Sequence, residues 1–136
     1  MNNAYKVNRF TIIFLAGEDY MIHLQKESGR IRLVLDAYFM GEDIIVLISG
    51  GDQPHLGTIT AGARLEPIQT VQLQNHKEFY ITEEIAVRLR KEFAGNFAIC
   101  CGAHLDHATK DEIRVLTDMA IQLGKELIGE LKQARL

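Results

Sequence analysis

A change of hydrophobic period divides the chain near residue 80. Before it, short apolar runs rich in β-branched and aromatic residues recur, as in RFTIIFLA (9–16) and DIIVLIS (43–49), which is typical of strands. After it, apolar residues recur every three to four positions, which is typical of helices that bury one face. The sequence therefore predicts a set of strands, then a helix, a strand and a helix.

The predicted strands of the first half are joined by glycine-containing turns. RFTIIFLA and YMIHLQ (20–25) flank GED (17–19), and IRLVLDAYFM (31–40) and DIIVLIS flank Gly41, so each pair reads as a hairpin. Two further strands are predicted within 56–63 and 64–73, where Pro67 favours an edge or a bend. This half therefore reads as a meander.

Two capping signals place the predicted helices. Thr82 is expected to be the N-cap of the first helix, with two glutamates in its first turn. After a strand in NFAICCGAHL (96–105), Thr109 and Glu112 have the spacing of a capping box that opens the last helix. The apolar stripe of that helix is expected to pack on the sheet and consists of Ile113, Leu116, Ala120, Leu123, Leu127 and Leu131.

This order of elements predicts one α+β domain over residues 1–136. A mostly antiparallel sheet with two helices packed on one face accounts for it best. At 136 residues the chain is long enough for one core and too short for two.

Composition and charge exclude several classes of function. A net charge of −3 gives no general electrostatic basis for binding nucleic acid, and no apolar run has the roughly 18 residues of a membrane span. The first ten residues lack the layout of a signal peptide, so a cytoplasmic protein is expected. The two cysteines are adjacent, so they point to opposite faces of a strand and are expected to be small buried residues.

The loop GGDQPHLG (50–57) follows the apolar run DIIVLIS, which is typical of a buried strand, and is the first candidate site. Its glycines allow close approach of the backbone to a bound group, and its proline shapes the loop in advance. Such a loop can present Asp52 and His55 to a ligand and can hold an anion on its amides, although a simple turn with a surface histidine explains it as well. The candidate residues are Gly50, Gly51, Asp52, Pro54, His55 and Gly57.

Two further polar clusters stand beside the predicted helices. His76, Lys77 and Glu78 precede the first helix, where a lysine together with the helix N-terminus suits a phosphate or a carboxylate. His104 lies at the carboxyl end of the late strand, a position that often borders a ligand site. A solvated turn and a structural histidine are the alternatives. The histidines would suit a metal if they converged, but no spacing in the sequence forces them to.

The motifs GGDQPHLG, HKE and GAHLDHATKDEI (102–113), in this order, resemble those of the prenylated-flavin chaperone family, the LpdD-like proteins that accompany UbiD-type decarboxylases. The resemblance implies a non-catalytic homodimeric carrier that binds prenylated FMN and helps to deliver it to the decarboxylase. It also implies a fold similar to that of proteasome-assembly chaperones. Under this resemblance the candidate residues named above bind the flavin. The loop amides, Lys77 and the start of the predicted Thr82 helix lie at its phosphate, and His55 and His104 lie at its ring system.

Two other functions stay open from the residues themselves. One is a small histidine-based enzyme, with or without a metal, that acts on a carboxylated or phosphorylated metabolite. The other is a protein-assembly factor without a small ligand, in which the glycine-rich loop is a docking surface.

Overall fold

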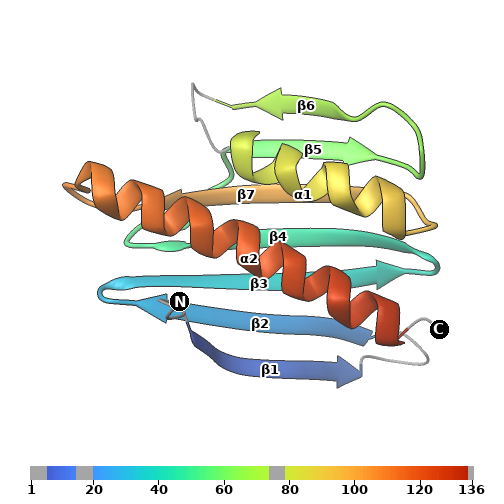
Figure 1. Cartoon of the computed structure of the whole chain (residues 1–136), viewed down its shortest axis with the longest axis horizontal. Coiled ribbons are helices and arrows are strands. Elements are labelled where there is room, and N and C mark those ends of the chain that lie inside the picture. The colour runs from blue at the N-terminus through green and yellow to red at the C-terminus, as the bar shows by residue number, and fades with distance from the viewer. Residues whose placement is uncertain (1–5, 15–19, 74–78, 135–136) are drawn as a thin grey trace.

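The chain forms a seven-stranded sheet with two helices on it (Figure 1) in the computed structural model, which describes residues 6–14, 20–73 and 79–134. The elements, in chain order, are β1 (Lys6–Phe14), β2 (Tyr20–Ser28), β3 (Ile31–Met40), β4 (Asp43–Gly51), β5 (Thr58–Gly62), β6 (Gln69–Gln72), α1 (Phe79–Glu92), β7 (Phe97–His104) and α2 (Lys110–Ala134). The expected α+β fold is confirmed. No helix in the described ranges combines the length and the apolar character that crossing a membrane requires.

The sheet has the order β1-β2-β3-β4-β7-β5-β6. The first four strands form the expected antiparallel meander. Strand β7 then lies between β4 and β5, parallel to β4 and antiparallel to β5, and β4–β7 is the one parallel pair among the described strands. The sheet is therefore mostly antiparallel, and its last strand occupies a central position.

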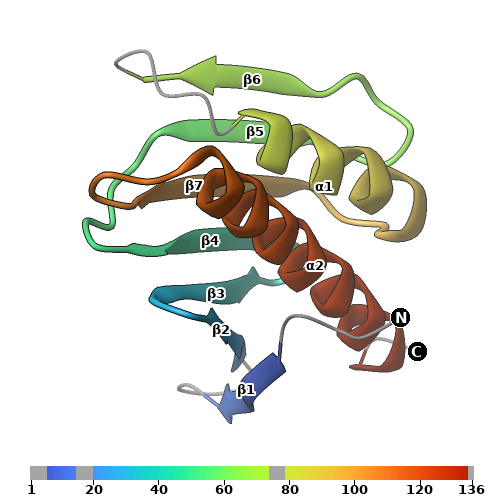
Figure 2. The same cartoon turned by 60° about the vertical axis from the view of Figure 1, so that its left-hand side comes forward.

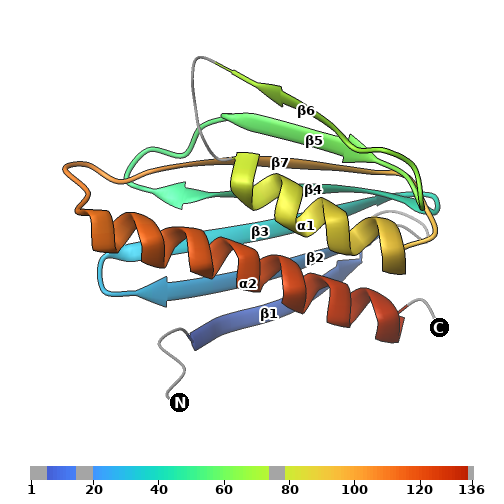
Figure 3. The ribbon, with the colours of Figure 1, turned by 45° about the horizontal axis from the view of Figure 1, so that its top comes forward.

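Both helices cover the same face of the sheet (Figures 2 and 3). Helix α1 packs on β5 and β7, and α2 packs on β2 and β3. Five members of the predicted stripe of α2 are buried, but Ile113 is 55% exposed. The expectation that Ile113 packs on the sheet is therefore wrong. It lies in the first turn of α2, close to the end of β7, where the helix does not cover the sheet closely.

The start of α1 differs from the prediction, and the start of α2 agrees with it. Helix α1 begins at Phe79, so Thr82 is not its N-cap; the buried Thr82 hydroxyl instead accepts a hydrogen bond from the Thr60 hydroxyl, at 2.7 Å. At α2 the capping box is confirmed. The Thr109 N–H donates to the Glu112 carboxylate (3.1 Å), and the Glu112 N–H donates to the Thr109 hydroxyl (3.0 Å).

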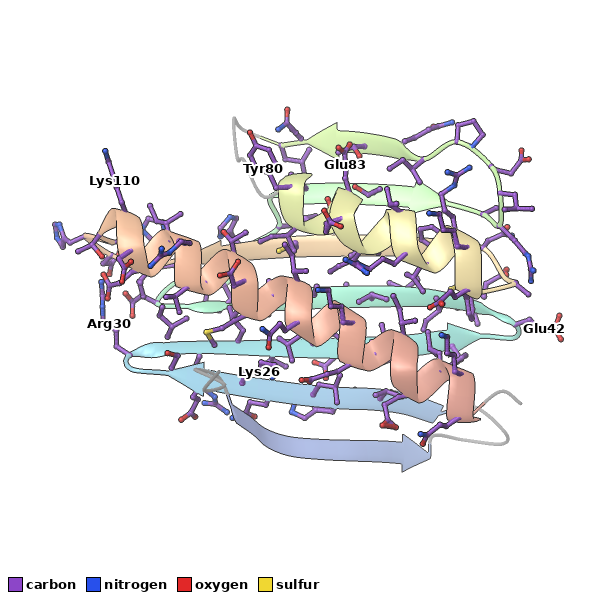
Figure 4. All side chains as sticks on the ribbon, in the orientation of Figure 1. Lys26, Arg30, Glu42, Tyr80, Glu83 and Lys110 are labelled. Carbon is purple, nitrogen blue, oxygen red and sulfur yellow. The ribbon has the colours of Figure 1, made fainter. Side chains whose placement is uncertain are left out.

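A buried lysine joins α2 to the sheet. Lys26 of β2, which is labelled in Figure 4, is 0% exposed and lies on the face that α2 covers. Its Nζ lies 2.8 Å from Oε1 of Glu126 on α2. The Glu126 side chain keeps about a third of its surface in contact with solvent. This ion pair therefore fixes the helix to the sheet at the edge of the core.

Neither of the two described helices covers the other face of the sheet. One apolar row crosses this face, made of residues that stand directly opposite one another on neighbouring strands: Leu47 of β4, Cys100 of β7, Ile59 of β5 and Val71 of β6. Val71 is 54% exposed and Leu47 is 39% exposed, whereas burial raises the pKa of the Cys100 thiol. This uncovered surface is called the open face below.

Candidate functional site

The loop between β4 and β5 passes around the carboxyl end of β7, because β4 and β5 are the two neighbours of β7 in the sheet. Four backbone N–H groups of the loop donate to carbonyl groups of β7: Asp52 to His104 (2.6 Å), Gln53 to His104 (3.3 Å), His55 to Gly102 (3.4 Å) and Gly57 to Cys101 (3.0 Å). The loop is thus held against the strand end over its whole length.

Glycines make this close contact possible. Gly51 has a φ of +73°, and a side chain there would collide with the His104 carbonyl. A side chain at Gly102 would collide with the carbonyl of His55. The glycine of the loop and the glycine of β7 therefore let two backbones meet.

Arg30, in the β2–β3 turn, ties this loop to the start of α2. Its guanidinium donates to both carboxylate oxygens of Glu112 (2.9 and 3.1 Å), to the carbonyl of Asp106 (2.8 Å) and to Oδ2 of Asp52 (3.3 Å). The bonds from Arg30, together with the Thr109 N–H, lower the pKa of Glu112 to about 2. The same pairing with Glu112 raises the pKa of Arg30.

Asp106 connects this network to His104. Its N–H donates to Oδ2 of Asp52 (2.9 Å), and its Oδ1 accepts from the Gln53 amide (3.2 Å). The same Oδ1 lies 3.1 Å from Nε2 of His104, whose side chain is half exposed. The His104 imidazole is therefore oriented by a carboxylate that the loop itself holds.

A hollow of about 510 Å³ opens beside His104, on the face of the sheet that the helices cover. It lies between the first turn of α1, the end of β7 and the first turns of α2, and is called the strand-end hollow below. Its lining is mainly apolar and comprises Tyr80, Ile81, Ala103, His104, Leu105, His107, Ala108, Ile113, Leu116 and Thr117. The carboxyl ends of β4 and β7 and the N-terminus of α2 lie on the left in Figure 1, and α1 begins nearer the middle and runs to the right.

The family model for the prenylated flavin chaperone LpdD-like domain matches residues 27–132. The chain belongs to this family. Protein LpdD of Lactiplantibacillus plantarum is 29% identical over 98 residues, which cover 68% of this chain and 72% of that protein. Membership of a chaperone family makes the chain a non-catalytic accessory protein, as the resemblance implied.

A solved structure shares the fold of this LpdD-like chain. It is a chaperone complex for yeast 20S proteasome assembly, which matches with a TM-score of 0.54 at 9% identity and covers 94% of this chain and 98% of that one. The expected similarity to proteasome-assembly chaperones is confirmed for the fold.

The structure brings only part of the predicted site to the hollow. His104 lines it, and Asp52 supports His104 through Asp106. Pro54 is exposed in the loop, and His55, whose Nδ1 lies 3.1 Å from the Gln53 carbonyl, is not among the lining side chains. His76, Lys77 and Glu78 lie outside the described residues, immediately before α1.

The structure assigns the loop amides a role different from the predicted one. We expected them to be able to hold a phosphate, but the N–H groups of Asp52, Gln53, His55 and Gly57 are bonded to β7. The N-terminus of α1 is a better candidate for holding an anion. Its first turn carries no acidic side chain, and Tyr80 of that turn lines the hollow. Within the described ranges, no three histidine, cysteine, aspartate or glutamate side chains gather as a metal site.

The sequence did not reveal several residues of the site. Arg30 belongs to a turn that carries no motif, and its partners are far away in sequence. The apolar stripe of α2 that looks like core includes Ile113 and Leu116. Tyr80 precedes Thr82, the predicted start of the first helix. The one available signal was the position of Ile113 in the first turn of a helix, directly after a candidate ligand-binding loop.

Proposed function

We propose that this LpdD-like chaperone binds prenylated FMN in the strand-end hollow and delivers it to a UbiD-type decarboxylase in the cytoplasm. The observation that carries the proposal is the hollow itself. A volume of about 510 Å³, with a mainly apolar lining and a few polar groups, is typical of sites for small aromatic ligands. The description of the family, a prenylated flavin chaperone, supports this choice of ligand.

The walls of the hollow suit a flat tricyclic ring. Ile113, Leu116 and Ala103 provide apolar surface for its faces, and His104 and His107 stand at the same hollow as hydrogen-bonding groups. Because Asp106 fixes the His104 ring and the loop fixes Asp106, the polar edge of the site is formed before the ligand arrives.

The phosphate of the flavin is assigned to the start of α1. Backbone N–H groups of a first helical turn favour an anion, and the first turn of α1 has no acidic side chain to compete with one. His76, Lys77 and Glu78 directly precede this turn in sequence, and in this proposal Lys77 neutralises the phosphate. The remaining loop residues act indirectly in this proposal, because they shape the loop around β7; they are Gly50, Gly51, Pro54 and Gly57.

The proposed test of the cargo compares two similar substitutions on the helices. Ile113→Asp places a charge in the hollow, and Val87→Asp places the same charge on α1 outside the hollow; both positions are exposed, at 55% and 40%. We expect Ile113→Asp to weaken binding of prenylated FMN by about tenfold or more and Val87→Asp to leave it unchanged. Equal affinities of both variants and the wild type, measured by fluorescence titration, would show that the hollow does not bind the flavin.

Transfer needs its own assay. The loaded chaperone is mixed with a flavin-free UbiD-type decarboxylase, and decarboxylation is followed over time. The expected result is faster activation than with the same concentration of free prenylated FMN. If the loaded chaperone and free prenylated FMN activate the decarboxylase at the same rate, the protein binds flavin but does not deliver it.

A homodimer through the open face completes the proposal. A seven-stranded sheet about 29 Å wide, with strands about 13 to 33 Å long, offers roughly 850 Å². This is close to the roughly 800 Å² that each partner contributes to a standard interface. The apolar row from Leu47 to Val71 would face its own copy about a two-fold axis. Leu47→Glu should give monomers by light scattering with the helix content unchanged; a wild type that is already monomeric at high concentration would rule out the dimer.

A further inference from the structure

A second hollow, of about 580 Å³, lies between the two helices on the same face of the sheet. It shares no residue with the strand-end hollow and lies further toward the C-terminal ends of α1 and α2. We call it the interhelical groove; its lining comprises Glu84, Val87, Arg88, Lys91, Glu92, Lys125, Ile128, Gly129 and Lys132.

The groove is basic although the whole chain has a net charge of −3. Four cationic side chains stand against two carboxylates, and each carboxylate is already paired: Arg88 with Glu84 at 3.6 Å, and Lys132 with Glu92 at 2.8 Å. Lys91 on one wall and Lys125 on the other have no ion-pair partner among the described residues. The groove thus keeps two exposed positive charges for an external anionic group.

The floor of the groove is apolar and open. Ile128 is 6% exposed and Val87 is 40% exposed, so aliphatic surface lies between the lysines. At Gly124, one turn earlier on α2, a Cβ atom would lie 2.5 Å from Cγ1 of Ile85, so packing against α1 requires the glycine. At Gly129 a Cβ atom would meet nothing within 4 Å. Helix packing therefore does not explain Gly129, although a glycine in mid-helix destabilises the helix.

On each wall of the groove, the lining residues are spaced so that a third helix could pack along them. On α1 the lining positions include 84, 87, 88 and 91, and on α2 they are 125, 128, 129 and 132. Both sets follow the i, i+3, i+4, i+7 pattern of one helical face, over about two turns. A short helix can lie along such a groove with its own apolar anchors on the floor.

We propose that the interhelical groove binds an acidic amphipathic helix of about two turns from the protein to which this chaperone docks. The apolar floor, the glycine and the two unpaired lysines together fit alternating aliphatic and carboxylate side chains. A nucleic acid backbone fits less well, because Glu84 and Glu92 would face a continuous row of phosphates. This inference rests on the chaperone role and goes beyond the flavin: the protein partner and the cargo use separate parts of one face.

The test uses a fluorescein-labelled peptide of 14 residues with leucines on one helical stripe and glutamates beside it, and no flavin. Fluorescence anisotropy measures its affinity for the full chain. A peptide of the same composition in scrambled order controls for non-specific attraction. Lys125→Glu and Gly129→Trp alter the groove, and Arg64→Glu, an exposed cation between β5 and β6, is the matched charge reversal elsewhere.

We expect the striped peptide to bind, Lys125→Glu to weaken it by about tenfold or more, Gly129→Trp to abolish binding, and Arg64→Glu to leave it unchanged. Equal affinity for the scrambled peptide, equal loss in Arg64→Glu, or full displacement by a single-stranded oligonucleotide would overturn the proposal. Binding of prenylated FMN by the Lys125→Glu variant is measured separately. If the peptide does not bind the wild-type chain but prenylated FMN does bind, the proposal for the groove fails. The proposal for the flavin then stands.

Discussion

The ion pair between Lys26 and Glu126 gives the most quantitative prediction for stability. The lysine is fully buried, and Glu126, 2.8 Å away on α2, is the acidic side chain that the structure pairs with it. Removing one partner of a buried pair costs about 3–5 kcal/mol, because the other charge stays buried without compensation. The Glu126 side chain is about a third exposed, so the lower end of this range applies.

We therefore expect Glu126→Ala to lower the free energy of unfolding by about 3 kcal/mol, or roughly 10 °C in melting temperature for a domain of this size. Lys26→Met keeps the volume of the side chain and removes the buried charge, so it should lie within about 1 kcal/mol of the wild type or be more stable. Denaturant unfolding at pH 7 of both single variants and the double variant measures the coupling.

Two results would refute this reasoning. In the first, Glu126→Ala is as stable as the wild type, which would mean that Lys26 finds other compensation. In the second, Lys26→Met is as unstable as Glu126→Ala, which would mean that the ion pair itself stabilises the fold. The double variant, Lys26→Met with Glu126→Ala, should resemble Lys26→Met alone, because no charge is then left buried.

Three further outcomes follow from described contacts and one from the proposed phosphate site. Arg30 lowers the pKa of Glu112 from its ordinary value of 4.5 to about 2. The Glu112 carboxylate therefore contributes fully to stability above about pH 4.5, and this contribution is lost as the pH falls toward 2. In urea unfolding curves, Glu112→Gln should reduce the loss of stability between these two pH values. Gly129→Ala should raise the melting temperature because its Cβ meets open space, worth at most about 1 kcal/mol, whereas Gly124→Ala should lower it through the clash with Ile85. Lys77→Ala should weaken the binding of phosphorylated flavin by about ten- to a hundredfold and leave the binding of dephosphorylated flavin unchanged. If titration shows that both flavins lose affinity equally, the phosphate assignment is contradicted.

Local signals predicted the fold well, and contacts between distant segments explain what they missed. The capping box at Thr109 and Glu112 was predictable because both partners lie within one turn. Thr82 looked like another cap, but its hydroxyl bonds to Thr60 on β5, a neighbour that the sequence does not reveal. The position of β7 between β4 and β5 was not predicted for the same reason.

Of the predicted site residues that the structure describes, His104 lines the hollow, and most of the walls of the hollow were not predicted. His104 was placed correctly at a strand end beside a ligand-sized hollow. The hollow exists because two helices start near that strand end, and their relative position depends on packing across the whole sheet. Ile113 therefore looked like a core residue in sequence and is a wall of the hollow in the structure.

The central position of β7 also determines when this protein can finish folding. Until residues 97–104 have left the ribosome, β4 has an unpaired apolar edge, and the β5–β6 hairpin has no strand to join. The sheet is completed only when the late strand inserts between these two parts, and pairing of this non-local kind is slow. A nascent chain that has reached β6 is therefore exposed to aggregation through β4, so a protein of a chaperone family is itself vulnerable during its own synthesis.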